Sequence, residues 1–564
     1  MKLNKEQYRA AKHVGGPMLV LAGPGSGKTH LLVERIRMMI EESGIQPENI
    51  LVITFSKKAA RQMQARFAGR VKDKSYPVTF GTFHAVFYHI LKEHNSDTYN
   101  LITEEQQHMF IREAVKVGSL SSDLFADPEY TDSIISMIGA YKNFGNDFYE
   151  RNECAARMTE KERSEFSTLL QAYDEICRKE SVLDFDDMIV MCRKLLYEHE
   201  MVLRKWQNIY RYILVDEFQD INDAQYDVLR LLASDSMNVF AVGDDDQSIY
   251  AFRGARPELM KKFLHQYAGC RQVTLTMNYR CCENVIGAAD TLIRHNMQRL
   301  ERPMQRHLPS NTQGSVYIVH SENTDIQAAY VCDMIEQLTH ENGYDADDIA
   351  VLYRTHHCVR MFEKTAEERG IRLRAAGDEG KVSRQDMIHE AYIRACENRA
   401  TRADIFLIMN TPPRGLSREA LCNSTGDYFN EFRSYYADDP EMLQKVDEFE
   451  AAVISYDPSS GTKTDQLSKK NAVNIMTAHA SKGLEYKCVF VIGLQEGLFP
   501  HHKNMSGIAV EEERRLMYVA MTRAKERLYM CCLGTEHGKR RSRFIGEVME
   551  KKRYIRDCLD LYRI

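Results

Sequence analysis

Short apolar runs and helical patterns alternate near the N-terminus. The runs Pro17–Ala22 and Ile50–Thr54 predict strands, and the spacing of apolar residues in Gly27–Glu42 and Lys57–Phe67 predicts helices. Strands joined by helices are typical of a parallel sheet, because each helix returns the chain to the same edge of the sheet. We therefore predict an α/β fold for this part of the chain.

Two long helix-rich stretches interrupt the predicted strands, from Gly81 to about Tyr210 and from about Lys381 to Lys470. Strand-like runs lie outside them, at Tyr212–Val215, Val239–Val242, Val273–Thr276, Ser315–Val319, Ile349–Tyr353 and Val489–Gly493. This order predicts two α/β lobes, each interrupted by a mostly helical insertion. The predicted boundaries are 1–85 and 211–275 for lobe 1, 86–210 for insertion 1, 276–380 and 471–546 for lobe 2, 381–470 for insertion 2, and 547–564 for a short C-terminal tail.

The composition is that of a globular protein, since 44% of the 564 residues are hydrophobic and 28% are charged. The longest apolar runs, such as Met18–Ala22 and Val489–Leu494, are shorter than the roughly 18 residues of a membrane span. The N-terminus carries no apolar signal sequence, so we expect a cytoplasmic protein without a membrane partner. The 14 Cys residues form no CxxC pair, which favours reduced thiols. The net charge of −6 gives no indication of a nucleic-acid partner.

A glycine-rich segment, Ala22-Gly-Pro-Gly-Ser-Gly-Lys-Thr29, joins the first predicted strand to the first long helix. In this context, backbone N–H groups turn inward to form an anion site at the positive end of the helix. Lys28 is then placed to reach the β- and γ-phosphates of a nucleotide, and Thr29 to coordinate Mg²⁺. The alternative is a glycine-rich turn without function, which the strand-to-helix context disfavours.

Two adjacent carboxylates, Asp216 and Glu217, follow the predicted strand Tyr212–Val215. One acid at the end of a parallel strand can hold Mg²⁺, and its neighbour can orient the attacking water. Paired acids alone are common on protein surfaces. Together with the glycine-rich segment, they favour ATP hydrolysis.

Further motifs follow one another along nearly the whole chain. They are Leu3–Gln7, Thr54–Ala60, Gly81–Ala85, Leu183–Asp187, Val215–Asp220, Gly243–Ala255, Leu275–Arg280, Asn474–Glu485 and Glu512–Ala524. In this order and spacing, the chain resembles the UvrD/PcrA/Rep group of superfamily 1 DNA helicases. The resemblance implies two RecA-like lobes of the P-loop NTPase type with a nucleotide site between them.

The resemblance assigns the nucleotide and its chemistry to named residues. Gln7 is expected to read adenine, Tyr279 to stack on it, and Gln247 to sense the γ-phosphate. Arg280 and Arg523 are expected to act as arginine fingers, and guanidinium groups suit this role because they bind phosphate oxygens. Surface salt bridges are the alternative role for both arginines. The expected nucleotide contacts are Gln7, Ala22, Gly23, Pro24, Gly25, Ser26, Gly27, Lys28, Thr29, Tyr279, Arg280, Glu485 and Arg523; the catalytic set is Lys28, Asp216, Glu217, Gln247, Arg280 and Arg523, with Thr29 and Asp216 on the metal.

Single-stranded nucleic acid is bound through aromatic stacking and polar backbone contacts. The resemblance places such contacts at Thr54, Phe55, Thr82, Phe83, His84, Tyr250, Phe252, Arg253, Thr477 and His479. A core position is the alternative for Phe83. Phe252 stands where relatives usually carry Trp, so we expect a weaker hold on DNA.

These expectations converge on a DNA-dependent ATPase. The resemblance implies a 3′-to-5′ DNA helicase or single-stranded DNA translocase that uses ATP and Mg²⁺, binds single strands and single-strand/duplex junctions, and acts on the nucleoid in DNA repair, replication or recombination. Insertion 2 is smaller than in better-known relatives, which leaves open a translocase that displaces proteins with little unwinding. A regulatory or scaffold subunit of a repair complex is a third alternative, and the complete catalytic set argues against it.

Overall fold

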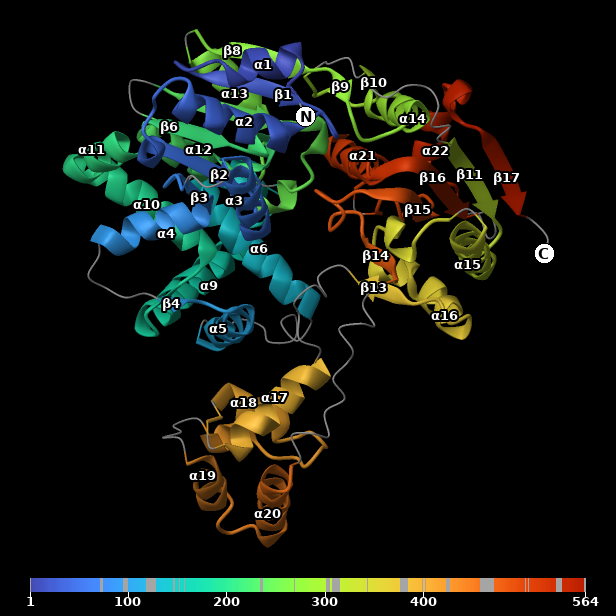
Figure 1. Ribbon diagram of the computed structural model, residues 1–564. Coiled ribbons are helices and arrows are strands. Elements are labelled where there is room, and N and C mark those ends of the chain that lie inside the picture. Colours follow the sequence, from blue (N-terminus) through green and yellow to red (C-terminus); the bar gives the residue numbers. More distant parts are fainter. Residues whose placement is uncertain are drawn as a thin grey trace.

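The computed structural model describes residues 2–71, 75–94, 100–117, 128–145, 148–151, 153–156, 158–233, 237–267, 269–300, 305–306, 315–341, 343–375, 384–397, 399–400, 402–421, 427–456, 471–502, 504–505, 507–533 and 540–561. It contains two α/β lobes and two helical insertions (Figure 1). The predicted fold class is therefore confirmed. No helix in these ranges is long and apolar enough to cross a membrane.

Lobe 1 is built on a six-stranded parallel sheet with the order β3-β2-β6-β7-β1-β8. Its strands are β1 (Met18–Ala22), β2 (Ile50–Thr54), β3 (Thr79–Thr82), β6 (Tyr212–Val215), β7 (Val239–Gly243) and β8 (Arg271–Leu275). Alternate residues enter the cores on opposite faces: Leu19 and Leu21 of β1 pack on one side, and Met18 and Val20 on the other. Burial on both faces explains why these strands read as unbroken apolar runs.

Helices cover both faces of this sheet. One core includes residues of α1 (Lys5–Ala11), α2 (Lys28–Glu41) and α3 (Lys57–Val71). The other includes residues of α4 (Phe83–His94), α10 (Phe185–Glu198), α11 (Glu200–Ile209), α12 (Asp223–Leu232) and α13 (Glu258–Gln266). Short 3₁₀ turns η1 (Pro47–Asn49), η4 (Phe218–Asp220), η5 (Asp245–Gln247) and η6 (Ala251–Arg253) lie in its connections.

Insertion 1 is smaller than the predicted 86–210. Its own core is formed by residues of α5 (Glu104–Val117), α6 (Pro128–Phe144), α7 (Phe148–Arg151), α8 (Glu153–Ala156), α9 (Glu160–Lys179) and β5 (Val182–Leu183). The exposed strand β4 (Asn100–Leu101) pairs with β5. The apolar faces of α4, α10 and α11 instead pack in the core of lobe 1, through residues such as Phe87, Cys192 and Trp206. Insertion 1 below therefore means residues 100–183.

Lobe 2 has a seven-stranded parallel sheet with the order β13-β14-β12-β15-β16-β11-β17. The strands are β11 (Ser315–Ser321), β12 (Ile349–Tyr353), β13 (Leu373–Ala375), β14 (Val473–Thr477), β15 (Tyr486–Leu494), β16 (Ala524–Leu533) and β17 (Asp557–Leu561). Its helices are α14 (Glu283–Ile293), α15 (Thr324–His340), α16 (Arg360–Glu368), α21 (Gly507–Met521) and α22 (Arg543–Met549), with 3₁₀ turns η7 (Ala346–Asp348), η8 (His356–Cys358) and η11 (Lys552–Tyr554). A two-stranded sheet of β9 (Met277–Asn278) and β10 (Gln305–Arg306) lies beside it.

The predicted C-terminal tail, 547–564, is wrong as a separate segment. Its strand β17 pairs in parallel with β11 at the edge of the lobe 2 sheet. The ring of Tyr554 packs so closely on α14 that a Cβ atom at Gly287 would lie 2.3 Å from the ring. The described residues up to Leu561 are therefore part of lobe 2.

Insertion 2 lies apart from both lobes in Figure 1. It contains α17 (Arg384–Cys396), α18 (Arg402–Ile408), the 3₁₀ turn η9 (Arg418–Leu421), α19 (Tyr428–Tyr435) and α20 (Pro440–Ile454) around its own core. Of the predicted range 381–470, residues 381–383, 398, 401, 422–426 and 457–470 lie outside the described residues.

Candidate functional site

The glycine-rich loop between β1 and α2 has the shape of a phosphate cradle. Gly25 and Gly27 have φ values of 65° and 84°, which favour glycine because a side chain would be strained there. Ser26 donates from Oγ to the carbonyl of Gly23 at 2.7 Å, which closes the turn. A Cβ atom at Gly25 would also lie 2.5 Å from Cβ of Arg280, so the loop fits tightly against lobe 2.

Residues distant in sequence hold this loop in place. Gln7 donates from Nε2 to the carbonyl of Ser26 at 2.9 Å, and Asn278 donates from Nδ2 to the carbonyl of Pro24 at 2.7 Å. Asn4, the N-cap of α1, donates from Nδ2 to the hydroxyl of Tyr279 at 2.8 Å. The two residues expected to contact the base, Gln7 and Tyr279, are thus brought together beside the loop.

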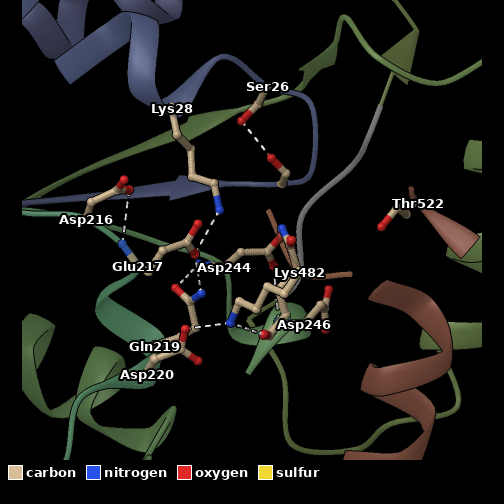
Figure 2. Close-up of polar contacts among 12 residues, drawn as sticks. Ser26, Lys28, Asp216, Glu217, Gln219, Asp220, Asp244, Asp246, Lys482 and Thr522 are labelled. Atoms are coloured by element: carbon tan, nitrogen blue, oxygen red, sulfur yellow. Dashed lines mark hydrogen bonds and ion pairs between the residues drawn. The ribbon is translucent and has the colours of Figure 1, made fainter. Parts of the chain in front are cut away.

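Lys28, at the start of α2, points to the carboxylates that follow β6 (Figure 2). Its Nζ lies 3.2 Å from Oε2 of Glu217. Burial disfavours ionised Glu217, but the charges of Lys28 and Lys482 outweigh that effect and lower its pKa to about 2. Burial and the charge of Glu217 raise the pKa of Asp216 to about 7. Glu217 adopts a left-handed backbone conformation with φ of 52°, a strained geometry that is concentrated at functional sites.

Arg523 brings a positive charge from lobe 2 to this group. Its side chain is buried, donating to the carbonyls of Val519 and Leu484, and its Nη2 lies 3.3 Å from Oε1 of Gln247 in lobe 1. Burial and the nearby charge of Arg280 lower its pKa to about 9, so it is cationic at neutral pH. The predicted γ-phosphate sensor and the predicted arginine finger are therefore in contact across the lobes.

Arg280 is held by a carboxylate of its own lobe. Its Nε donates to Oε2 of Glu485 at 2.7 Å, and Nζ of Lys525 lies 2.9 Å from Oε1 of the same carboxylate. Burial disfavours the ionised form of Glu485, but Lys525 and Arg280 outweigh it and lower its pKa. Two cations thus share one anion beside the loop.

A row of aromatic rings passes from lobe 1 to lobe 2. Phe55 and Tyr250 are stacked, with centroids 4.8 Å apart, and Phe252 contacts Tyr250 and then His479 of lobe 2 at centroid distances of 5.9 and 5.8 Å. Phe252 is 56% exposed and Phe55 is 38% exposed. Exposed rings in a row are a surface on which bases can stack.

Polar residues lie at the carboxyl ends of neighbouring strands. Thr54, Thr82 and Thr477 end β2, β3 and β14, the edge at which open α/β sheets bind ligands. Their hydroxyls already take part in local turns: Thr54 donates to the carbonyl of Ser56, and the other two accept from Ala85 and Ala480. His84 packs edge-on against Phe185, and burial lowers the pKa of His84 to about 4.

Comparison with known proteins identifies the family. A family model described as the UvrD/REP helicase N-terminal domain matches residues 3–268, and one described as the UvrD-like helicase C-terminal domain matches residues 273–460 and 432–534. The chain belongs to the UvrD/REP helicase family. YjcD of Bacillus subtilis is 32% identical and is matched over 98% of this chain and 82% of its own length. The ATP-dependent DNA helicase PcrA of Staphylococcus aureus is 29% identical, over 97% of this chain and 86% of its own length.

The resemblance to the UvrD group is thereby confirmed. The alignment with YjcD extends over 640 positions, more than the 564 residues of this chain. YjcD therefore contains internal segments that this family member lacks.

Sequence reasoning missed the residue that joins the nucleotide side to the aromatic row. Lys482 of lobe 2 lies 2.5 Å from Oδ2 of Asp220 and donates to the carbonyl of Gln247 at 2.7 Å (Figure 2). Its Nζ also lies 4.9 Å from the ring centroid of Tyr250. Both charged partners lie inside motifs that the sequence displays, Asn474–Glu485 and Val215–Asp220, but their pairing depends on the fold.

Two expectations about nucleic-acid contacts change with the structure. Phe83 is wrong as a stacking surface, because its ring is buried in the core of lobe 1 against Phe87, at the start of α4. Phe185, in the motif Leu183–Asp187, was not predicted as a contact, yet it is 52% exposed beside His84. The side chain of Arg253 lies outside the described part of the structure.

Proposed function

We propose that this protein is an ATP-dependent DNA helicase that moves 3′ to 5′ along single-stranded DNA, the polarity that the family resemblance implies. The contact of Arg523 in lobe 2 with Gln247 in lobe 1 carries the proposal. A phosphate loop alone supports a nucleotidase. An arginine supplied by a second lobe makes hydrolysis depend on how the lobes approach each other, which is the requirement of a motor.

The residues around the loop suit ATP and Mg²⁺. Lys28 and the backbone N–H groups of residues 23 and 25–27 form the phosphate site, since Pro24 has no N–H, and Gln7 and Tyr279 form the base site. Thr29 and Asp216 supply the hydroxyl and carboxylate oxygens that Mg²⁺ prefers. The described residues contain no cluster of three His, Cys, Asp or Glu that could hold a metal alone, which agrees with an ion shared with phosphate and water. ATP bound with Mg²⁺ is the phosphoryl donor, and transfer of its γ-phosphoryl group to water would supply the free energy for movement.

The protein groups act by exchanging partners. Lys28 leaves Glu217 when it turns to the phosphates, and this frees an ionised carboxylate to accept a hydrogen bond from the attacking water. Arg280 leaves Glu485 for the phosphate in the same way, and Arg523 approaches past Gln247. Each exchange moves a cation toward developing negative charge, which lowers the barrier to hydrolysis.

The aromatic row suits single-stranded DNA. Its rings belong to both lobes, so a change in lobe spacing changes the distance between stacking surfaces. Lys482 lies under Tyr250 and bonds Asp220 and Gln247, which places one cation between the stacking surface and the nucleotide site. We infer that single strands and single-strand/duplex junctions are the substrates, and that the protein acts on the nucleoid in DNA repair, replication or recombination.

Two observations favour a second candidate. Insertion 2 lies apart from the lobes, and the chain lacks internal segments that YjcD contains. Both facts favour a translocase that strips proteins from single strands with little unwinding of its own.

A strand-displacement assay on duplexes with either a 3′ or a 5′ single-stranded tail tests the proposal. We expect ATP-dependent unwinding of the 3′-tailed duplex alone, and none by the Lys28→Ala control. DNA-stimulated ATPase without unwinding, together with removal of streptavidin from one biotinylated strand end, selects the translocase. Unwinding of the 5′-tailed duplex contradicts the polarity.

A further inference from the structure

A buried polar network joins insertion 1 to lobe 1 at the end of helix α6. Lys142 lies 2.7 Å from carboxylate oxygens of both Asp184 and Asp187, at the N-terminus of α10, and 3.3 Å from Asp174. The side chain of Lys142 is only 8% exposed. A buried cation with several carboxylates is costly to separate, so α6 is fixed against α10.

The next residue, Asn143, links this network to a different part of lobe 1. Its Nδ2 donates to Oδ1 of Asp186 in α10 at 2.7 Å, and its Oδ1 accepts from Nδ2 of Asn222 at 3.1 Å. Asn143 and Asn222 are both buried. Within α6, a Cβ atom at Gly139 would lie 2.6 Å from Oδ2 of Asp186, so the absence of a side chain there allows α10 to come this close.

Asn222 stands where the catalytic segment ends. It is the N-cap of α12 and follows the turn η4, in which the amide of Asp220 donates to the carbonyl of Glu217. The amide of Arg256 donates to the carbonyl of Ile221, and Gly254 lies against Asn222. Asn222 therefore touches both the segment that carries Glu217 and the turn that follows Phe252.

The other end of the network lies next to His84 and Phe185, where we expect DNA to bind. Asp186 is adjacent to Phe185, whose exposed ring packs on His84. A ring contact from His84 to Phe185, the chain link to Asp186, and two hydrogen bonds through Asn143 thus lead to Asn222, at the end of the segment that carries Glu217.

We propose that Asn143 is a positioning residue through which DNA bound at His84 and Phe185 acts on the position of Glu217 and so stimulates ATP hydrolysis. This inference rests on the proposed function. Because coupling between distant groups requires a measured interaction rather than proximity, a double-mutant cycle is the appropriate test.

The cycle uses Asn143→Ala, Asn222→Ser and the double variant of the full chain, with steady-state ATPase measured with and without saturating oligothymidine. Serine keeps the N-cap of α12 but removes the Nδ2 donor. We expect the ratio of DNA-stimulated to basal kcat to fall about fivefold in each single variant and no further in the double variant. Basal kcat and the KM for ATP stay within about twofold of the unmodified protein.

Asn296→Ala is the matched control. Asn296 is also buried and makes two side-chain hydrogen bonds, to the carbonyl of Glu511 and from Arg514, but it belongs to lobe 2. It should lower Tm as much as Asn143→Ala does and leave the stimulation ratio unchanged. Stimulation retained in both Asn143→Ala and Asn222→Ser, independent multiplicative losses, or an equal fall in basal kcat overturns this inference alone. No stimulation in the unmodified protein overturns the proposed function, and this inference with it.

Discussion

The two insertions are attached to the protein in different ways. Insertion 1 meets lobe 1 through buried polar groups, with Lys142 among three carboxylates and Asn143 between Asp186 and Asn222. Insertion 2 has an apolar core of its own and lies apart from the lobes (Figure 1). Two of its ion pairs, from Arg433 to Asp447 and to Glu450, stay within the insertion. Insertion 1 is therefore coupled to lobe 1 by buried polar groups, whereas the core and these two ion pairs of insertion 2 are internal.

Lys28→Ala should have the largest effect, because it removes the ATP hydrolysis on which the function of both insertions depends. The loss of the phosphate-binding cation should reduce kcat for ATP by about 10³-fold or more, with or without DNA. Malachite-green phosphate release measures it. Exposed Lys161→Met should behave as the unmodified protein, and retention of a tenth of the activity in Lys28→Ala would contradict the assigned site.

Lys142→Met tests how strongly insertion 1 is held to lobe 1, because it removes the charge that joins them. Removing the cation leaves the buried carboxylate of Asp184 and the partly exposed carboxylate of Asp187 without it, which should cost about 3–5 kcal/mol of unfolding free energy. Urea unfolding followed by tryptophan fluorescence measures the cost, since Trp206 packs in the adjoining lobe 1 core. The control Lys161→Met removes an exposed i,i+4 pair and should cost less than about 1 kcal/mol. Equal costs in the two variants would show that the network does not hold insertion 1.

Phe252→Trp tests the row of rings that both lobes share. A larger ring increases stacking area, so single-stranded DNA should bind about two- to fivefold more tightly, and Phe252→Leu should weaken binding about tenfold. Fluorescence anisotropy with labelled oligothymidine measures both. If the Leu variant binds as well as the unmodified protein, the aromatic row is not the strand's path.

Replacing residues 384–456 by a short Gly/Ser linker tests insertion 2 and should have the smallest effect on hydrolysis. Because its core is separate from those of the lobes, DNA-stimulated kcat should stay within about threefold of the unmodified protein. The same phosphate-release assay measures this, and strand displacement reports any change in unwinding. A collapse of DNA-stimulated hydrolysis in this variant would remove the distinction between the insertions.

Much of the fold follows from local pattern. The strands Ile50–Thr54, Tyr212–Val215 and Ile349–Tyr353 have the predicted bounds, because a strand buried on both faces is an unbroken apolar run. Thr79–Thr82 and Asp557–Leu561 contain polar residues at the edges of their sheets and give no such signal. The predicted limits of insertion 1 are also wrong, because an amphipathic helix does not reveal which core its apolar face joins.

The site likewise contains parts that can be predicted from local sequence and parts that depend on the fold. The phosphate loop and the acids after β6 are contiguous motifs, so their chemistry can be predicted from spacing. The pairs Lys482–Asp220 and Asn143–Asn222 join residues that are 262 and 79 positions apart. Burial then decides between alternatives that one sequence leaves open, as with Phe83 in the core and Phe185 on the surface.

A nucleotide site built from both lobes should respond to DNA. The most direct test is the steady-state ATPase rate of the unmodified full chain with and without saturating single-stranded DNA. We expect stimulation of about tenfold or more, abolished by Lys28→Ala. Equal rates in the presence and absence of DNA would contradict it.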